Sequence, residues 1–107
     1  METSMATFVK VAEVASIAAD TAMVVQVGGC NIALFNVAGT FYAIDDVCSH
    51  EGGSLGEGEL AGEVVSCPWH CSQFSVKTGE GLGPPAAEHV RRFPVKIQGN
   101  DVLVEVD

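Results

Sequence analysis

The sequence lacks any long hydrophobic run. Its apolar stretches, such as residues 23–25 and 32–35, have the length of a β-strand. They are far shorter than the roughly 20 apolar residues that cross a bilayer as a helix. Residues 1–5 contain neither a basic region nor an apolar segment of signal-peptide length. We therefore expect a soluble, cytoplasmic protein that does not bind membranes.

Basic residues are also scarce. Five Lys and Arg stand against fourteen Asp and Glu, and the formal net charge is −9. No Lys or Arg occurs between Lys10 and Lys77, whereas acidic residues gather in residues 45–63. This balance argues against nucleic acid as a partner, because nucleic-acid binding needs a basic surface. The acidic residues are expected to steer the chain toward a basic patch on another protein. Acidic loops that only keep the protein soluble are the alternative interpretation.

Cysteine and histidine are few, and most of them fall into two short boxes. The first box is Cys48-Ser49-His50 and the second, sixteen residues later, is Cys67-Pro68-Trp69-His70. Thiolate and imidazole suit iron–sulfur clusters, zinc or copper better than calcium or magnesium. Zinc sites with two Cys and two His usually have paired cysteines and paired histidines, whereas each box here holds one of each. This set is what a [2Fe–2S] centre needs when two histidines replace two cysteines on one iron.

At this point the sequence resembles the Rieske family, whose C-x-H and C-P-x-H motifs it matches over residues 48–70. The resemblance continues through Ser72-Gln73-Phe74 and Lys77-Thr78-Gly79. It reaches Gly83-Pro84-Pro85, which looks like the family's proline loop. A stiff surface loop without a cofactor role is the alternative for that last segment.

The resemblance implies a fold and a cofactor. The expected architecture is an all-β, antiparallel sandwich or barrel with a small cluster-binding subdomain formed by two loops. The whole chain, residues 1–107, would be one Rieske domain, with the cluster-binding part at about residues 45–85. One [2Fe–2S] cluster per chain is implied, with four ligands. These ligands are Cys48, His50, Cys67 and His70.

Residues beside the ligands would tune the cluster. Trp69 and Pro84 are interpreted as apolar cover, and Ser72 stands where high-potential family members place a hydroxyl donor to a bridging sulfide. The Tyr hydroxyl that provides their second donor would fall at Phe74, which has none. The disulfide that staples their cluster loops would need cysteines at Gly53 and Trp69, and is absent. We therefore predict a potential in the lower part of the Rieske range of roughly −150 to +300 mV.

The remaining pattern predicts an all-β class without an amphipathic helix. Three β-rich runs, separated by Gly28-Gly29 and Ala38-Gly39, indicate an antiparallel meander through residues 23–44. A single strand is expected over residues 90–97, with Pro94 at an edge or bulge. Further runs that favour strands are 8–11, 64–66 and 102–106.

Residues 45–63 are predicted to form a glycine-rich loop. Its glycines would let backbone amides approach the cluster sulfides closely. They are Gly52, Gly53, Gly56 and Gly58. For Gly58, and for Gly62 further along, a plain turn is the simpler interpretation.

Two cysteines lie outside the boxes. Cys30 precedes an apolar run and is interpreted as a small core residue. Cys71 follows His70 at a position where the family commonly has Gly. A Cys30–Cys71 disulfide is the alternative, which a reducing cytoplasm disfavours.

The resemblance implies a carrier of single electrons rather than an enzyme. The donor would be an NAD(P)H-dependent flavoprotein reductase, and the acceptor the terminal oxygenase of an aromatic-ring dioxygenase. No nucleophile–base pair or substrate-binding signature is evident. Three alternatives stay open. They are the small Rieske subunit of an NAD(P)H nitrite reductase, a zinc-binding interaction module without redox chemistry, and a sensor in which Cys71 reacts.

Overall fold

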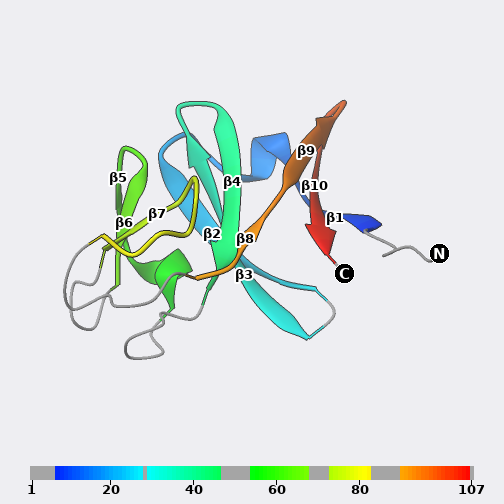
Figure 1. The fold of residues 1–107 in the computed structure, drawn as a ribbon. Helices are drawn as coiled ribbons and strands as arrows, with labels where there is room; N and C mark the ends of the chain where they lie inside the picture. The colour runs from blue at the N-terminus through cyan, green and yellow to red at the C-terminus, as the bar shows by residue number, and fades with distance from the viewer. Residues whose placement is uncertain (1–6, 28, 47–53, 68–72, 83–89, 107) are drawn as a thin grey trace.

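The computed structural model describes residues 7–27, 29–46, 54–67, 73–82 and 90–106, which form three antiparallel sheets. In Figure 1, the smallest sheet lies on the side of the molecule away from both chain ends. The strands are β1 (Thr7–Glu13), β2 (Thr21–Val27), β3 (Cys30–Val37), β4 (Thr40–Asp45), β5 (Glu59–Ala61), β6 (Val64–Ser66), β7 (Gln73–Ser75), β8 (Arg92–Phe93), β9 (Val95–Gln98) and β10 (Asp101–Val106). Two short 3₁₀ helices are η1 (Val14–Ser16) and η2 (Leu55–Glu57). The all-β prediction is confirmed.

The central sheet has the order β2-β3-β4-β8, and its first three strands are the predicted meander. Side chains of β3 alternate between two cores, as the period of two in a strand requires. Ala33 and Phe35 belong to one core, which we call the cluster-side core, and Ile32 and Leu34 belong to the other, the distal core. All four side chains are fully buried. The apolar run in the sequence is therefore continuous because both faces of β3 are covered.

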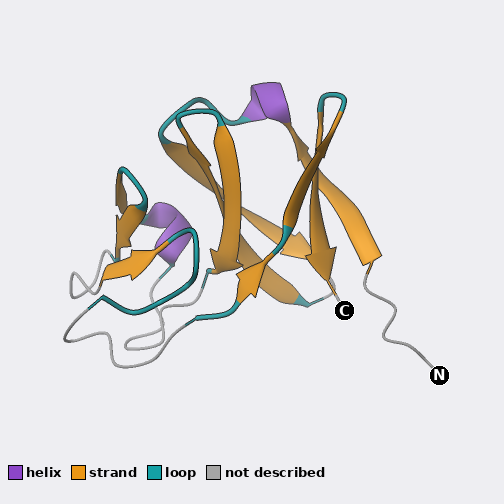
Figure 2. Cartoon of the chain, turned by 45° about the horizontal axis from the view of Figure 1, so that its top comes forward, coloured by secondary structure: helices purple, strands orange, loops and turns teal. Residues whose placement is uncertain are grey.

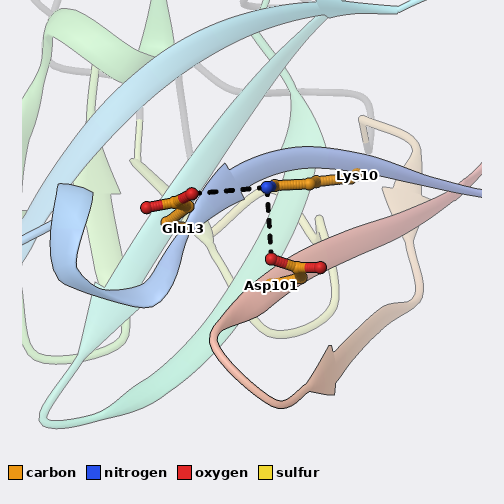
Figure 3. Close-up of polar contacts among 3 residues, drawn as sticks. All are labelled: Lys10, Glu13 and Asp101. Atoms are coloured by element: carbon orange, nitrogen blue, oxygen red, sulfur yellow. Dashed lines mark hydrogen bonds and ion pairs between the residues drawn. The ribbon is translucent and has the colours of Figure 1, made fainter.

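The second sheet, β1-β10-β9, covers the distal core. Val102 and Val104 of β10 are fully buried there. Cys30 lies at the margin of this core and is only partly buried, so the interpretation of Cys30 as a core residue holds in part. Where β1 meets β10, the Lys10 ammonium lies 3.2 Å from an Asp101 carboxylate oxygen and 3.3 Å from one of Glu13 (Figure 3). Hydrogen bonds to Asp101 and then to Glu13 raise the pKa of Lys10 above its ordinary value.

The prediction of one strand over residues 90–97 is wrong. The segment forms two strands in different sheets, because β8 pairs with β4 and β9 pairs with β10 (Figure 2). Pro94 stands between them and has no N–H group to continue a ladder. Its carbonyl accepts the Glu105 N–H at 2.9 Å. Proline therefore marks the point where the chain passes from one sheet to the next.

The third sheet, β5-β6-β7, is small. β6 lies at the expected residues, but β5 and η2 occupy a stretch that we predicted to be loop. A strand of three residues is too short to show alternation, and the Glu and Ala of β5 are depleted in strands. Among the described residues, no helix is long and apolar enough to cross a membrane.

Candidate metal centre

Cys67 is the predicted ligand that the structure describes, and it follows directly after β6. Ser66 is paired with Gln73 of β7, so the residues that flank positions 67–72 lie side by side. Cys67 is 1% exposed and sits in the cluster-side core with Val65 and Phe74. A thiolate is costly to bury in apolar surroundings unless a positive centre compensates its charge. The position therefore suits a metal ligand.

The other predicted ligands, Cys48, His50 and His70, lie outside the described residues, as do Trp69, Ser72 and Pro84. This explains why no group of three or more metal-ligating side chains is found together in the described part.

Phe74 lies one residue into β7, opposite Val65. Its side chain is fully buried in the same core as Cys67. The core around Cys67 therefore includes an aromatic ring without a hydroxyl group.

The described residues that flank the first box return to the same core. Asp46 and Ser54 bound residues 47–53, and the Leu55 N–H donates to the Asp46 carbonyl at 2.6 Å. The Leu55 side chain is fully buried in the cluster-side core. A residue that follows this segment therefore packs in the same core as Cys67.

The ends of the proline segment, residues 83–89, are held by β7 and the turn after it. The Leu82 N–H donates to the Gln73 carbonyl at 2.9 Å. At the other end, the Val90 N–H donates to the Gly79 carbonyl at 2.8 Å. Val90 is buried in the cluster-side core. Leu55, Cys67 and Val90, which flank the three segments, thus all lie in the cluster-side core.

Two glycines of the predicted loop do not have the roles that we expected. Gly56 donates its N–H to the Asp46 carboxylate at 2.7 Å, so this amide is not available to a sulfide. Gly58 is more than a turn residue, because a Cβ there would lie 2.0 Å from the Ser66 carbonyl oxygen. Its lack of a side chain lets η2 approach β6. Gly62 is a turn glycine, with φ of +62° and open space around it.

The residues fit a His₂Cys₂ cluster, and comparison with known proteins decides the family. A family model described as the Rieske [2Fe-2S] domain matches residues 7–94. The chain belongs to the Rieske [2Fe–2S] family. It therefore carries one [2Fe–2S] cluster, as the boxes predicted.

Similar proteins include Rieske ferredoxins. The 3-phenylpropionate/cinnamic acid dioxygenase ferredoxin subunit of Shigella boydii is 45% identical over 76 residues, covering 70% of this chain and 72% of that protein. The ferredoxin of carbazole 1,9a-dioxygenase from Nocardioides aromaticivorans has a TM-score of 0.88 and 29% identity, and the match covers 92% of this chain and 96% of that one. A complex of reduced oxygenase and oxidized ferredoxin in carbazole 1,9a-dioxygenase contains a chain with a TM-score of 0.86 and 34% identity, and 91% of each chain is covered. This Rieske domain is thus an electron-transfer component, not a catalyst.

A hollow of about 160 Å³ lies elsewhere on the Rieske domain, among β4, β8 and β9. Lys77 and Arg92 line it together with aromatic side chains. None of its lining residues belongs to either box.

Proposed function

We propose that two cysteines and two histidines hold the cluster, with four further residues around it. The ligands are Cys48, His50, Cys67 and His70. The surrounding residues are Trp69, Ser72, Phe74 and Pro84. Two observations support the assignment: Cys67 is buried in an apolar core at the end of β6, and Leu55 and Val90, which flank the other two segments, lie in the same core. We also propose that residues 1–107 form a single domain, with the cluster-binding part at about 45–85.

The chemistry follows from the ligand set. Neutral imidazoles in place of two thiolates make the oxidised cluster less negative, so that it accepts one electron more readily than an all-cysteine cluster does. The protein contributes the apolar surroundings of Cys67. Phe74 and Leu55, both fully buried, exclude water from this side of the thiolate.

We propose that the chain passes single electrons from an NAD(P)H-dependent flavoprotein reductase to the terminal oxygenase of an aromatic-ring dioxygenase, in the cytoplasm. The 45% identity to a dioxygenase ferredoxin subunit carries this proposal. The structural similarity to a ferredoxin seen with an oxygenase supports it. The 45% identity to a dioxygenase ferredoxin subunit also favours the dioxygenase role over that of a nitrite reductase subunit. The family favours a redox cofactor over a zinc module.

The charge pattern supports transient contacts with both partners. Fourteen acidic residues against five basic ones favour encounter with basic surfaces, in a manner that salt weakens. The reduction rate by a matched reductase should therefore fall as ionic strength rises.

A potentiometric titration followed by electron paramagnetic resonance tests the proposal. We expect red-brown protein with a rhombic signal whose average g value is below that of all-cysteine clusters, appearing at low potential. Colourless protein that contains zinc would overturn the electron-transfer role. The same signal in a stable complex with a large sirohaem protein would move the chain to nitrite reduction.

A further inference from the structure

Asp46 stands out among the charged residues. It is 5% exposed, and no other charged side chain is buried among the residues that the structure describes. It is the last described residue before the first box and lies two positions from Cys48. Two residues of chain span at most about 7 Å, so this carboxylate is close to the box in space as well as in sequence.

The carboxylate is bound to the far end of the same segment. Its Oδ1 accepts a hydrogen bond from the Ser54 hydroxyl at 2.9 Å and another from the Gly56 N–H at 2.7 Å. Charge-assisted hydrogen bonds of this kind are about twice as strong as neutral ones. Together with the backbone bond from Leu55 to Asp46, they close residues 47–53 at their base.

The Asp46 backbone ties this closure to the central sheet. Its N–H donates to the carbonyl of Asn31, in β3, at 3.0 Å. Gly56 makes the close approach possible, because a Cβ there would lie 2.5 Å from a Val24 methyl carbon and 3.0 Å from Asp46 Oδ1. The residues that flank positions 47–53 are therefore joined to each other and to β3 through one residue, Asp46.

We propose that Asp46 is the positioning residue of the first box, and that its negative charge lowers the reduction potential of the cluster. The proposal rests on the ligand roles proposed for Cys48 and His50. Oδ1 joins the described residues on either side of positions 47–53, and this fixes the points at which the segment with both ligands begins and ends. The charge disfavours an added electron nearby. By Coulomb's law, at an effective dielectric constant of about 20, a unit charge within roughly 12 Å of any redox centre changes such an equilibrium by about tenfold or more.

Three variants separate position from charge. Asp46→Asn keeps an Oδ1 acceptor for Ser54 and Gly56 but removes the charge. Asp46→Ala removes both, and Ser54→Ala removes one hydrogen bond while leaving the charge. Asp20→Asn is the matched control, because Asp20 also accepts a backbone N–H through Oδ1, from Ala38, but is exposed. The holoprotein of each variant is titrated potentiometrically, and its cluster lifetime is measured in the presence of a chelator.

We expect Asp46→Asn to keep the wild-type lifetime and to shift the reduction equilibrium about tenfold toward the reduced form, which is 59 mV for one electron. Asp46→Ala and Ser54→Ala should shorten the lifetime severalfold. If Asp46→Ala does not fold, the lifetime of Ser54→Ala decides. Wild-type lifetimes in both would overturn the positioning role, and an unchanged potential in Asp46→Asn, or an equal shift in Asp20→Asn, would overturn the charge role. Wild-type protein without a His-ligated signal would instead overturn the proposed function.

Discussion

The central sheet and the small sheet, β5-β6-β7, differ in the length of their strand pairing and in how much they bury. Seven residue pairs join β2 to β3, whereas three join β5 to β6 and three join β6 to β7. The central sheet has fully buried side chains on both faces of β3. A three-stranded sheet of this size buries little by itself. It depends instead on the shared cluster-side core, on single hydrogen bonds and, in our proposal, on the cofactor.

The two cores differ in how they are connected to the cluster segments. The distal core draws its buried residues from strands of the two larger sheets and from Ile17 beside them. The cluster-side core combines the central sheet with residues that flank the cluster segments, including Leu55, Cys67 and Val90. Substitutions near the cluster should therefore destabilise the small sheet first, and they should leave the stability of the distal core unchanged.

The largest effect is expected from Cys67→Ala. Loss of a proposed ligand should abolish the cluster, because metal binding supplies folding free energy to the residues that form the site. Hydrogen exchange should then accelerate in β5 to β7 and stay slow in β2 to β4 and β10. Cys30→Ala is the control, since Cys30 lies at the margin of the distal core and the cluster should be retained. Unchanged protection of β5 to β7 in colourless Cys67→Ala protein would show that the small sheet is stable without the cofactor.

Two glycines give a matched test of packing in the two regions. Gly79 and Gly29 have nearly the same φ, +81° and +84°. A Cβ at Gly79 would lie 2.2 Å from the Val90 carbonyl oxygen, whereas a Cβ at Gly29 would meet nothing within 4 Å. Gly29→Ala should therefore cost about 1 kcal/mol of unfolding free energy from backbone strain alone.

Gly79→Ala adds a steric clash to the same strain, and should cost about 3 kcal/mol. It should also weaken the Val90 anchor of the proline segment. Chemical denaturation of both holoproteins and the chelator lifetime of the cluster measure the two effects. Equal costs would mean that the turn at Gly79 moves freely and holds nothing in place.

Much of the fold and the type of cofactor could be predicted from the sequence. The Cys/His boxes identify a cofactor through ligand chemistry, and the meander follows from β-rich runs separated by turn glycines. The strand β5 was missed because three residues carry no periodic signal. Pro94 was expected at an edge or bulge, and β8 and β9 are indeed edge strands of their sheets. The missing N–H in fact separates two sheets, which only the pairing partners reveal.

The contacts that hold the site together left no local signal. The sequence did not distinguish Asp46 from the other acidic residues, because its burial depends on Ser54 and Gly56 eight and ten residues later. Gly58 read as a turn glycine, because the carbonyl that excludes its Cβ belongs to Ser66 on another strand. Such roles arise from tertiary contacts, and sequence patterns record them poorly.

A smaller effect is expected at Phe74, where the comparison concerns potential instead of stability. Phe74→Tyr adds a hydroxyl beside the core that holds Cys67, and the new donor should stabilise the reduced cluster. We expect the midpoint to rise by about 30 to 60 mV, equivalent to a threefold to tenfold change. Phe41→Tyr, in the distal core, should leave the potential unchanged. A midpoint that does not move in Phe74→Tyr would count against the explanation of a low potential by a missing donor.

The smallest effect is expected at Lys10, where β1 pairs with β10. Its ion pairs with Asp101 and Glu13 raise its pKa above the ordinary 10.5. Because the folded-state pKa lies above the unfolded value, the charged Lys10 contributes its full stabilisation at pH values below the ordinary 10.5. This contribution is lost as the pH rises through the folded-state pKa. Because the pair is exposed and screened by salt, Lys10→Gln should slightly lower the denaturation midpoint at neutral pH and low salt. The difference from wild type should disappear in high salt and at high pH, and the redox midpoint should stay the same. A change in the redox midpoint would show that the distal sheet and the cluster are coupled, contrary to the division drawn above.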